Sequence, residues 1–225
     1  MRSSTLSKPA SDSRLGEDLL WREVRTTPFS KPAKALFLDR DGVLIEEKEY
    51  IQDPADVVLL PGVVELIRAA RELGMATVEV TNQAGIAHGY SGWAEFIEVE
   101  NRVGELLRQS EVSLDGIFAC PFHPRGKAPY NSADHAWRKP NPGMLLEAAK
   151  SLNLDLRDSV MVGDKPSDLE AARTAKFAFG IHVLTGHGKR DRELSRAVAT
   201  PDFPVHVVSS AADAVTLLRA RWNHP

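Results

Sequence analysis

The chain has 225 residues, and its 28 Lys and Arg against 31 Asp and Glu give a formal net charge of −3. This balance excludes a general excess of positive charge for gripping nucleic acid, and a hydrophobic content of 43% excludes intrinsic disorder. The single cysteine, Cys120, fits a reducing compartment, and neither a membrane-spanning apolar run nor an N-terminal secretory signal is found. We therefore expect a cytoplasmic protein without nucleic-acid or membrane partners.

Residues 1–34 are rich in Ser and Pro and differ from the rest of the chain. We expect roughly the first 14 residues to be mobile and the apolar island at Leu19, Leu20 and Trp21 to dock on the domain. Residues 35–225 are expected to form that single domain.

From Ala35 onward, short apolar runs alternate with segments of helical periodicity. The predicted strands cover residues 35–38, 76–80, 116–119, 160–162, 179–183 and, at an edge, 205–208. The predicted helices cover residues 63–73, a segment capped by Ser91 with an apolar face from Trp93 to Leu107, and residues 144–152, 167–175 and 211–222. This alternation predicts an α/β fold, a three-layer Rossmann-like parallel sheet with helices on both faces. In such sheets, ligands bind beyond the carboxyl ends of the strands.

Two carboxylates follow the first of these strands. Asp39 and Asp41 point the same way if the strand persists, so they require a cation or a shared proton. A divalent ion would keep Asp39 ionised for metal binding or attack on an electrophile, while Asp41 exchanges a proton. The same sequence pattern also forms turns and helix caps, so alone it leaves catalysis undecided.

Two further polar segments stand at predicted element ends. Thr81 begins a turn whose N–H groups suit an oxyanion or a phosphate, although such turns are also common without a ligand. Arg138 and Lys139 lie in a loop stiffened by Pro140 and Pro142, and Pro142 is expected to open the next helix. Their charges suit a phosphate dianion, and the alternative is a solvated basic turn.

Asp164 stands just after the strand 160–162, and Asp168 follows it one helical turn later. Hard oxygen ligands of this type favour Mg²⁺, whereas Asp168 could equally cap its helix. Along the chain, two carboxylates are thus followed by a hydroxyl, a lysine and further carboxylates, each at a predicted strand end or helix start. Their joint arrangement predicts one site.

These segments resemble the four motifs of the haloacid dehalogenase superfamily of phosphohydrolases. Phe37–Val43 resembles the first motif, Thr81 the second, Lys139 the third, and Asp164 with Asp168 the fourth. The resemblance covers roughly residues 35–190 and is closest to the branch of heptose bisphosphate phosphatases and histidinol phosphatases. The segments that carry this closer resemblance are Pro61–Gly62, Thr81–Gly89, Arg138–Met144 and Gly163–Lys165.

The resemblance implies a Mg²⁺-dependent phosphomonoesterase that works through an aspartyl-phosphate on Asp39, with Asp41 as acid and base. It implies the catalytic set Asp39, Asp41, Thr81 and Lys139. It implies metal binding by Asp39, by the main-chain carbonyl of Asp41, and by Asp164. Substrate contacts are expected from Arg40, Glu47, Tyr50, Asn82, Gln83 and Arg138.

The loop from Cys120 to Trp137 departs from that branch, which often carries a structural zinc there on Cys-x-His and Cys-x-Cys pairs. The corresponding residues here are Cys120, Phe122, His135 and Trp137. Two of the four positions are aromatic, so we expect no structural zinc. The alternative is a shifted set made of Cys120, His123, Asp134 and His135. The branch also tends to have Arg where this chain has His88.

The short stretch between Asp41 and Thr81 leaves no room for a large cap domain, so the Cys120–Trp137 loop is expected to wall the substrate pocket. The implied substrate is a small phosphorylated sugar, D-glycero-D-manno-heptose 1,7-bisphosphate cleaved at position 7. Histidinol phosphate is the alternative, favoured by an acidic pocket if Glu46, Glu47 and Glu49 form one. A non-catalytic phosphate-binding module is a further alternative, against which both retained aspartates argue. We expect a monomer.

Overall fold

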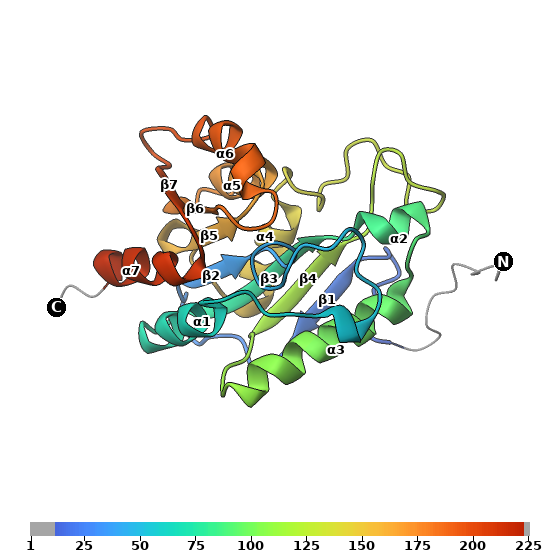
Figure 1. Cartoon of the computed structure of the whole chain (residues 1–225), viewed down its shortest axis with the longest axis horizontal. Helices are drawn as coiled ribbons and strands as arrows, with labels where there is room; N and C mark the ends of the chain where they lie inside the picture. The colour runs from blue at the N-terminus through green and yellow to red at the C-terminus, as the bar shows by residue number, and fades with distance from the viewer. Residues whose placement is uncertain (1–11, 223–225) are drawn as a thin grey trace.

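The computed structural model describes residues 12–222, and a seven-stranded sheet runs through the middle of this part (Figure 1). The strands are β1 (Trp21–Val24), β2 (Ala35–Leu38), β3 (Ala76–Asn82), β4 (Gly116–Cys120), β5 (Val160–Gly163), β6 (Phe179–Val183) and β7 (Val205–Val208). Their order across the sheet is β1-β4-β3-β2-β5-β6-β7, with β1 antiparallel to β4 and all other neighbours parallel. Leu38 at the end of β2 pairs with Glu79 on one side and Val162 on the other, so the carboxyl ends of three strands lie together.

Helices cover both faces of this sheet. They are α1 (Val63–Glu72), α2 (Ala84–His88), α3 (Trp93–Gln109), α4 (Gly143–Leu152), α5 (Pro166–Thr174), α6 (Gly188–Arg196) and α7 (Ala211–Trp222), with short 3₁₀ turns at η1 (Pro54–Asp56) and η2 (Leu156–Asp158). Figure 1 shows α1 and α3 along one face, which α7 extends, while α4 and α5 pack on the other. Alternate side chains of each strand supply the two cores: Leu36 and Leu38 of β2 enter the first, and Phe37 the second. The predicted α/β architecture is confirmed.

Two helices were not expected from the sequence. The helix α2 has only five residues, too few to show a helical period. The helix α6 is almost entirely polar, and only Gly188 and Ser195 of it are buried. An apolar stripe is the signal by which helices are recognised in a sequence, and neither segment carries one.

Two predicted helix starts are corrected. The N-cap of α3 is Gly92, not Ser91, because the Glu95 carboxylate accepts the Gly92 N–H at 2.8 Å. Pro142 is the N-cap of α4 rather than its first helical residue. Both corrections shift a boundary by one residue and leave the helices in place.

The apolar island near the N-terminus docks as predicted and also adds the antiparallel edge strand β1. Trp21 is fully buried, stacks on Trp93 with ring centroids 5.8 Å apart, and meets Phe96 edge-on at 5.3 Å. The mobility predicted for the first 14 residues falls mostly on residues 1–11, which lie outside the described residues. The domain boundary expected after residue 34 remains a prediction.

Two long connections rise above the carboxyl ends of the parallel strands, residues 39–62 and residues 121–142. The second is tied to α2 by the Lys127 N–H, which donates to the Ala87 carbonyl at 2.7 Å, and Figure 1 shows it beside that helix. Within residues 12–222 neither connection builds a separate cap domain. No helix in this described part is both long and apolar enough to cross a membrane.

We expect Trp21→Ala to lower the free energy of unfolding by about 3–5 kcal/mol, because it removes a fully buried aromatic ring from the core. Urea denaturation followed by circular dichroism measures the change. The matched control is Val24→Ala on the same strand, whose side chain is 42% exposed and whose loss should cost far less. Equal losses in the two variants would show that β1 is not part of the core.

Candidate active site

The strand β2 delivers the two predicted catalytic carboxylates to the edge of the sheet. Asp39 is the first residue beyond β2, is 5% exposed, and donates its N–H to the Val162 carbonyl of β5 at 3.1 Å. The chain then turns at Gly42, whose φ of +85° is a conformation that glycine adopts without strain. The Gly42 N–H donates to the Ile45 carbonyl at 2.9 Å, so the chain turns back directly after Asp41.

Three buried carboxylates converge at this edge. Oxygens of Asp39, Asp164 and Asp168 lie within 4.8 Å of one another, and among residues 12–222 no other group of three or more candidate metal ligands converges in this way. Asp164 is fully buried; its Oδ2 accepts the His187 N–H at 2.7 Å, while its Oδ1 accepts no hydrogen bond from the described residues. A Cβ added to Gly42 would lie 2.4 Å from Asp164 Oδ2, so the glycine backbone closes tightly on this carboxylate.

The buried ammonium of Lys139 offsets part of this negative charge. Its Nζ lies 2.6 Å from Asp168 Oδ1, 2.9 Å from Asp39 Oδ1 and 2.7 Å from the Val80 carbonyl. Burial opposes the charged form of Lys139, but Asp168 and Asp39 outweigh it and raise the lysine pKa. The second oxygen of Asp168 accepts the Lys165 N–H at 3.1 Å, so this residue both caps α5 and pairs with Lys139.

The pKa values of Asp39 and Asp164 are shifted in opposite directions. Burial opposes ionisation of Asp39, but Lys139 and Lys165 outweigh it, and the pKa of Asp39 falls below its ordinary value. Burial and the neighbouring Asp39 raise the pKa of Asp164 to about 8. A proton on Asp164 therefore balances the cluster at neutral pH when no cation lies there. Hard oxygen donors with an unused lone pair fit a divalent cation such as Mg²⁺.

The Asp41 carboxylate accepts hydrogen bonds from two side chains, Arg40 and Gln83. Arg40 donates from Nη2 to Asp41 Oδ2 at 3.0 Å and from Nε to Oδ1 at 3.1 Å. The Gln83 amide donates to Asp41 Oδ2 at 3.0 Å and to the Thr81 hydroxyl at 2.8 Å. Arg40 is 2% exposed and contacts Asp41, and the substrate contact expected of it stays a prediction.

Other predicted substrate residues also contact protein groups. Asn82 holds the Lys139 loop through two hydrogen bonds, from its amide to the Lys139 carbonyl at 3.0 Å and from the Lys139 N–H to Asn82 Oδ1 at 3.1 Å. Glu47 Oε2 lies 3.2 Å from Lys165 Nζ and 3.4 Å from His187 Nε2. Substrate contact by Asn82 and Glu47 stays a prediction.

Aromatic and basic side chains from separate segments gather around Tyr50. The Tyr50 ring lies 4.8 Å from Tyr90 and 6.2 Å from His88, and the His88 ring lies 4.6 Å from His123. Burial, with Arg138 and His88 nearby, lowers the pKa of His123 to about 4, so this imidazole is neutral at pH 7. Arg138 donates to the Phe122 carbonyl at 2.9 Å. Tyr50 and Arg138 thus remain the predicted substrate residues best placed for contact.

The loop that carries zinc in the resembling branch is held here by aromatic packing. Phe122 stacks on His135 with ring centroids 4.0 Å apart and planes 2° apart, and Arg22 lies 4.3 Å over the buried Trp137 ring. Burial raises the pKa of the Cys120 thiol to about 12. Among residues 12–222, Cys120 belongs to no group of three or more converging candidate metal ligands. The donor set does not fit a four-coordinate zinc, and the absence of structural zinc stays our prediction.

Two parts of the site were missed by the reading of the sequence. The segment Gly163–Lys165 predicts no role for Lys165 in the site. In the structure, Lys165 Nζ contacts Glu47 and lies 3.9 Å from Asp164 Oδ1. The loop after β6 was missed altogether: the Thr185 hydroxyl donates to the Gly42 carbonyl at 2.6 Å, and His187 holds Asp164. The sequence signal that could have revealed this loop is the pair of closely spaced glycines after the strand 179–183, Gly186 and Gly188.

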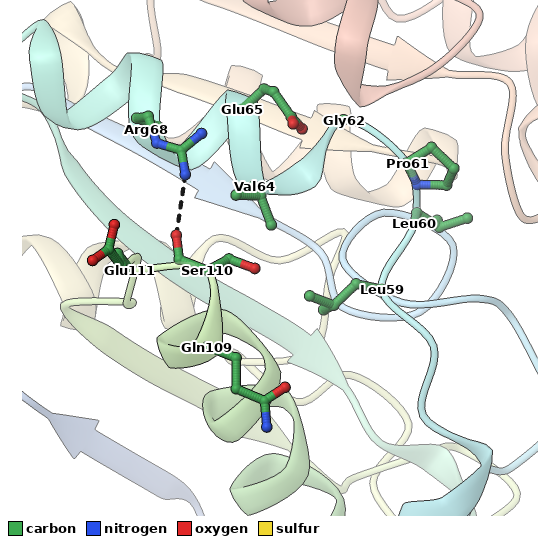
Figure 2. Close-up of a pocket in the computed structure, with 10 residues that line it drawn as sticks. All are labelled: Leu59, Leu60, Pro61, Gly62, Val64, Glu65, Arg68, Gln109, Ser110 and Glu111. Atoms are coloured by element: carbon green, nitrogen blue, oxygen red, sulfur yellow. Dashed lines mark hydrogen bonds between the residues drawn. The ribbon is translucent and has the colours of Figure 1, made fainter.

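An open pocket of about 670 Å³ lies away from these residues, between α1 and the end of α3 (Figure 2). Arg68 of α1 crosses it and donates to the Ser110 carbonyl at 3.1 Å. None of the predicted site residues lines this pocket. We therefore place the candidate active site at the strand ends and not in this pocket.

Comparison with known proteins agrees with this geometry. A family model described as HAD-hydrolase-like matches residues 136–214. A D-glycero-beta-D-manno-heptose-1,7-bisphosphate 7-phosphatase of Mesorhizobium japonicum is 45% identical over 192 residues, 85% of this chain and 84% of that protein. A D-glycero-alpha-D-manno-heptose-1,7-bisphosphate 7-phosphatase of Burkholderia mallei is 40% identical over 185 residues, 82% of this chain and 93% of that protein.

Among solved structures, the D,D-heptose 1,7-bisphosphate phosphatase of B. bronchiseptica, complexed with magnesium and phosphate, superposes with a TM-score of 0.72 at 29% identity. The match covers 84% of this chain and 99% of that one. The shared sheet, the length of the match and the converging aspartates lead to one assignment. The chain belongs to the haloacid dehalogenase-like hydrolases, in the family of the heptose bisphosphate phosphatases, and is a phosphatase.

Proposed function

We propose that this phosphatase removes the 7-phosphate of D-glycero-D-manno-heptose 1,7-bisphosphate through an aspartyl-phosphate formed on Asp39. The observation that carries the proposal is the buried Asp39 carboxylate, which pairs with Lys139 and lies within 4.8 Å of two further buried carboxylates, Asp164 and Asp168. The similarity to relatives of this specificity supports the choice of substrate.

In the first step, Asp39 attacks phosphorus. Within the described residues, hydrogen bonds to the Asp39 carboxylate come from Arg40 N and Lys139 Nζ, and both reach Oδ1. Oδ2 is therefore the oxygen we assign to attack. A bond forms between Oδ2 and phosphorus, and the bond from phosphorus to the sugar oxygen breaks. Asp41, which must enter this step protonated, gives its proton to that oxygen. Lys139 and the Thr81 hydroxyl, which lies at the end of β3, hold the phosphoryl group.

In the second step, Asp41 takes a proton from water as that water attacks phosphorus. The bond between phosphorus and Asp39 Oδ2 breaks, inorganic phosphate leaves, and both aspartates return to their starting states. Asp41 is 17% exposed, so one side of its carboxylate is open to the sugar oxygen and then to water. One carboxyl group thus serves both steps.

Magnesium fits the oxygen donors of this site. Asp39, Asp164 and the main-chain carbonyl of Asp41 would hold the ion, since Asp168 is already paired with Lys139. When bound, the ion supplies positive charge that offsets the repulsion between the phosphate dianion and the carboxylates. The buried Asp164 oxygen without a hydrogen-bond donor is the structural feature that supports this assignment.

The charges around the site favour an anionic sugar over a cationic substrate. Glu47 is paired with Lys165 and His187, so it is not free to bind the positive charge of histidinol phosphate. Arg138, next to Lys139 in the chain, offers a positive charge to a second phosphate. Histidinol phosphate therefore becomes the weaker alternative. A cytoplasmic location, a role in carbohydrate metabolism and a monomeric state remain our predictions.

We expect kcat/KM to be highest for heptose 1,7-bisphosphate in a panel with both of its anomers, histidinol phosphate and a nucleoside monophosphate. Released phosphate is measured with Mg²⁺ and again after EDTA, which should abolish turnover because the carboxylates then repel the substrate. A higher kcat/KM for histidinol phosphate would contradict the proposed substrate. Turnover that survives EDTA would contradict the proposed role of the metal.

Asp39→Asn should abolish turnover without loss of the fold, because the amide is nearly isosteric but is not a nucleophile. Asp41→Asn should leave phosphorylation slow and the phosphoenzyme long-lived, since it removes both the acid and the base. Acid-quench trapping of labelled phosphoenzyme measures both effects, with exposed Asp202→Asn as the control. Trapped phosphate on the Asp39→Asn variant would show that another residue is the nucleophile.

A further inference from the structure

A buried guanidinium lies directly beneath the proposed acid and base. Arg40 is 2% exposed, and its side chain ends 5.7 Å from the centre of the Phe96 ring of α3. One edge of the guanidinium, Nε and Nη2, contacts the Asp41 carboxylate at 3.0 and 3.1 Å. Nη2 also donates to Gln83 Oε1 at 3.0 Å. The mechanism described above makes no direct use of this residue.

The other edge of Arg40 is fixed from a distant part of the chain. Glu100 of α3 is 2% exposed and accepts Nη1 of Arg40 through Oε1 at 3.0 Å. Its second oxygen accepts no hydrogen bond from the described residues. Taking a carboxylate and a guanidinium out of water is costly, and such a pair adds little stability over an apolar pair of the same size. Stability alone therefore gives no physical reason for this pair.

Glu79 on β3 is a third acidic side chain near Arg40, and it makes no hydrogen bond to it. It is fully buried, and neither of its oxygens has a hydrogen-bond partner among the described residues. Burial, with Glu100 nearby, raises the pKa of Glu79 well above its ordinary value. Arg40 makes its hydrogen bonds to carboxyl groups with two other residues, Glu100 behind it and Asp41 in front.

This arrangement restricts how Asp41 can turn. Arg40 holds both of its oxygens, and Gln83 holds Oδ2 while also binding the Thr81 hydroxyl. A planar guanidinium fixed at one edge presents its other edge in a single plane. We propose that Glu100 is a positioning residue, which acts through Arg40 to aim the Asp41 carboxyl at the leaving oxygen and then at water. This inference rests on the proposed function of Asp41.

The physical reason is that proton transfer depends on direction as well as on acidity. A general acid contributes only when its proton points at the oxygen that leaves. Arg40 and Asp41 are neighbours in the chain, and without Glu100 the arginine loses the hydrogen bond that fixes Nη1, so it restrains Asp41 less. Loss of Glu100 should therefore slow chemistry and leave substrate binding almost unchanged.

The first test replaces Glu100 and measures kcat and KM separately for heptose bisphosphate. Glu100→Leu should lower kcat by about 10- to 100-fold with KM changed by less than about threefold. Glu100→Gln keeps an acceptor oxygen for Arg40 Nη1 and should recover most of the loss. The matched control is Glu98→Leu, which changes an exposed residue of the same helix. A fall in kcat/KM that comes only from KM would overturn the proposal.

The second test separates positioning from a merely structural role. Single-turnover formation of the phosphoenzyme is measured with p-nitrophenyl phosphate, whose leaving group needs little protonation, and with the sugar phosphate, whose alkoxide needs it. Glu100→Leu should slow the sugar reaction at least about tenfold more than the p-nitrophenyl reaction. Adding Glu100→Leu to Asp41→Asn should cause no further loss in the sugar reaction. Equal slowing of the two esters, or additive losses, would overturn the proposal.

If Glu100→Leu does not fold, as judged by circular dichroism, the same comparison of the two esters is made with Glu100→Asp, whose shorter side chain keeps the negative charge but withdraws the acceptor from Arg40 Nη1. The same two outcomes then decide. Failure of the proposed function has a different signature. Wild-type enzyme that hydrolyses neither ester with Mg²⁺, or an Asp39→Asn variant that still forms phosphoenzyme, would remove the basis of the proposal. Active wild-type enzyme with equal slowing in the variant would remove only the role of Glu100.

Discussion

Electrostatic repulsion among three buried carboxylates is the constraint on which the site depends. Asp39, Asp164 and Asp168 share one small region, and Lys139 contacts two of them directly. The charge that Lys139 leaves unbalanced is taken up by a proton on Asp164 or, we propose, by a divalent cation. A phosphate dianion can approach Asp39 only when this balance is met. In this proposal, the nucleophile, the lysine and the metal form one electrostatic unit, and changing one member alters the others.

The parallel sheet makes this crowding possible, because it brings the ends of β2, β3 and β5 to one edge. Turns that only glycine fits comfortably let the chain close over Asp164, while Asn82 and Asp168 fix the loop and helix that carry the cations. Behind the edge, the pair of Arg40 with Glu100 extends the network into the core. We therefore expect few residues to contact the substrate. Most of the polar groups around them fix the orientation of those residues.

Apolar alternation and strand-end motifs were sufficient to predict the parallel strands, five of the helices and the segments that meet at the site. The polar helix α6 and the five-residue α2 were missed because neither presents an apolar stripe. The sequence also could not distinguish an arginine that faces substrate from one that faces a glutamate 60 residues away, as Arg40 does. Such pairings depend on which side chains the folded core brings together, and no spacing along the chain encodes them.

The most direct test of the proposed electrostatic unit is the pH dependence of Mg²⁺ binding. The pKa of Asp164 is raised to about 8, so below pH 8 the ion must displace a proton. Isothermal titration calorimetry between pH 6 and 8, in two buffers of different ionisation enthalpy, should show affinity rising by up to about tenfold per pH unit with release of about one proton. Asp164→Asn should lose both the binding and the proton release. Mg²⁺ affinity that stays constant from pH 6 to 8 would contradict the account.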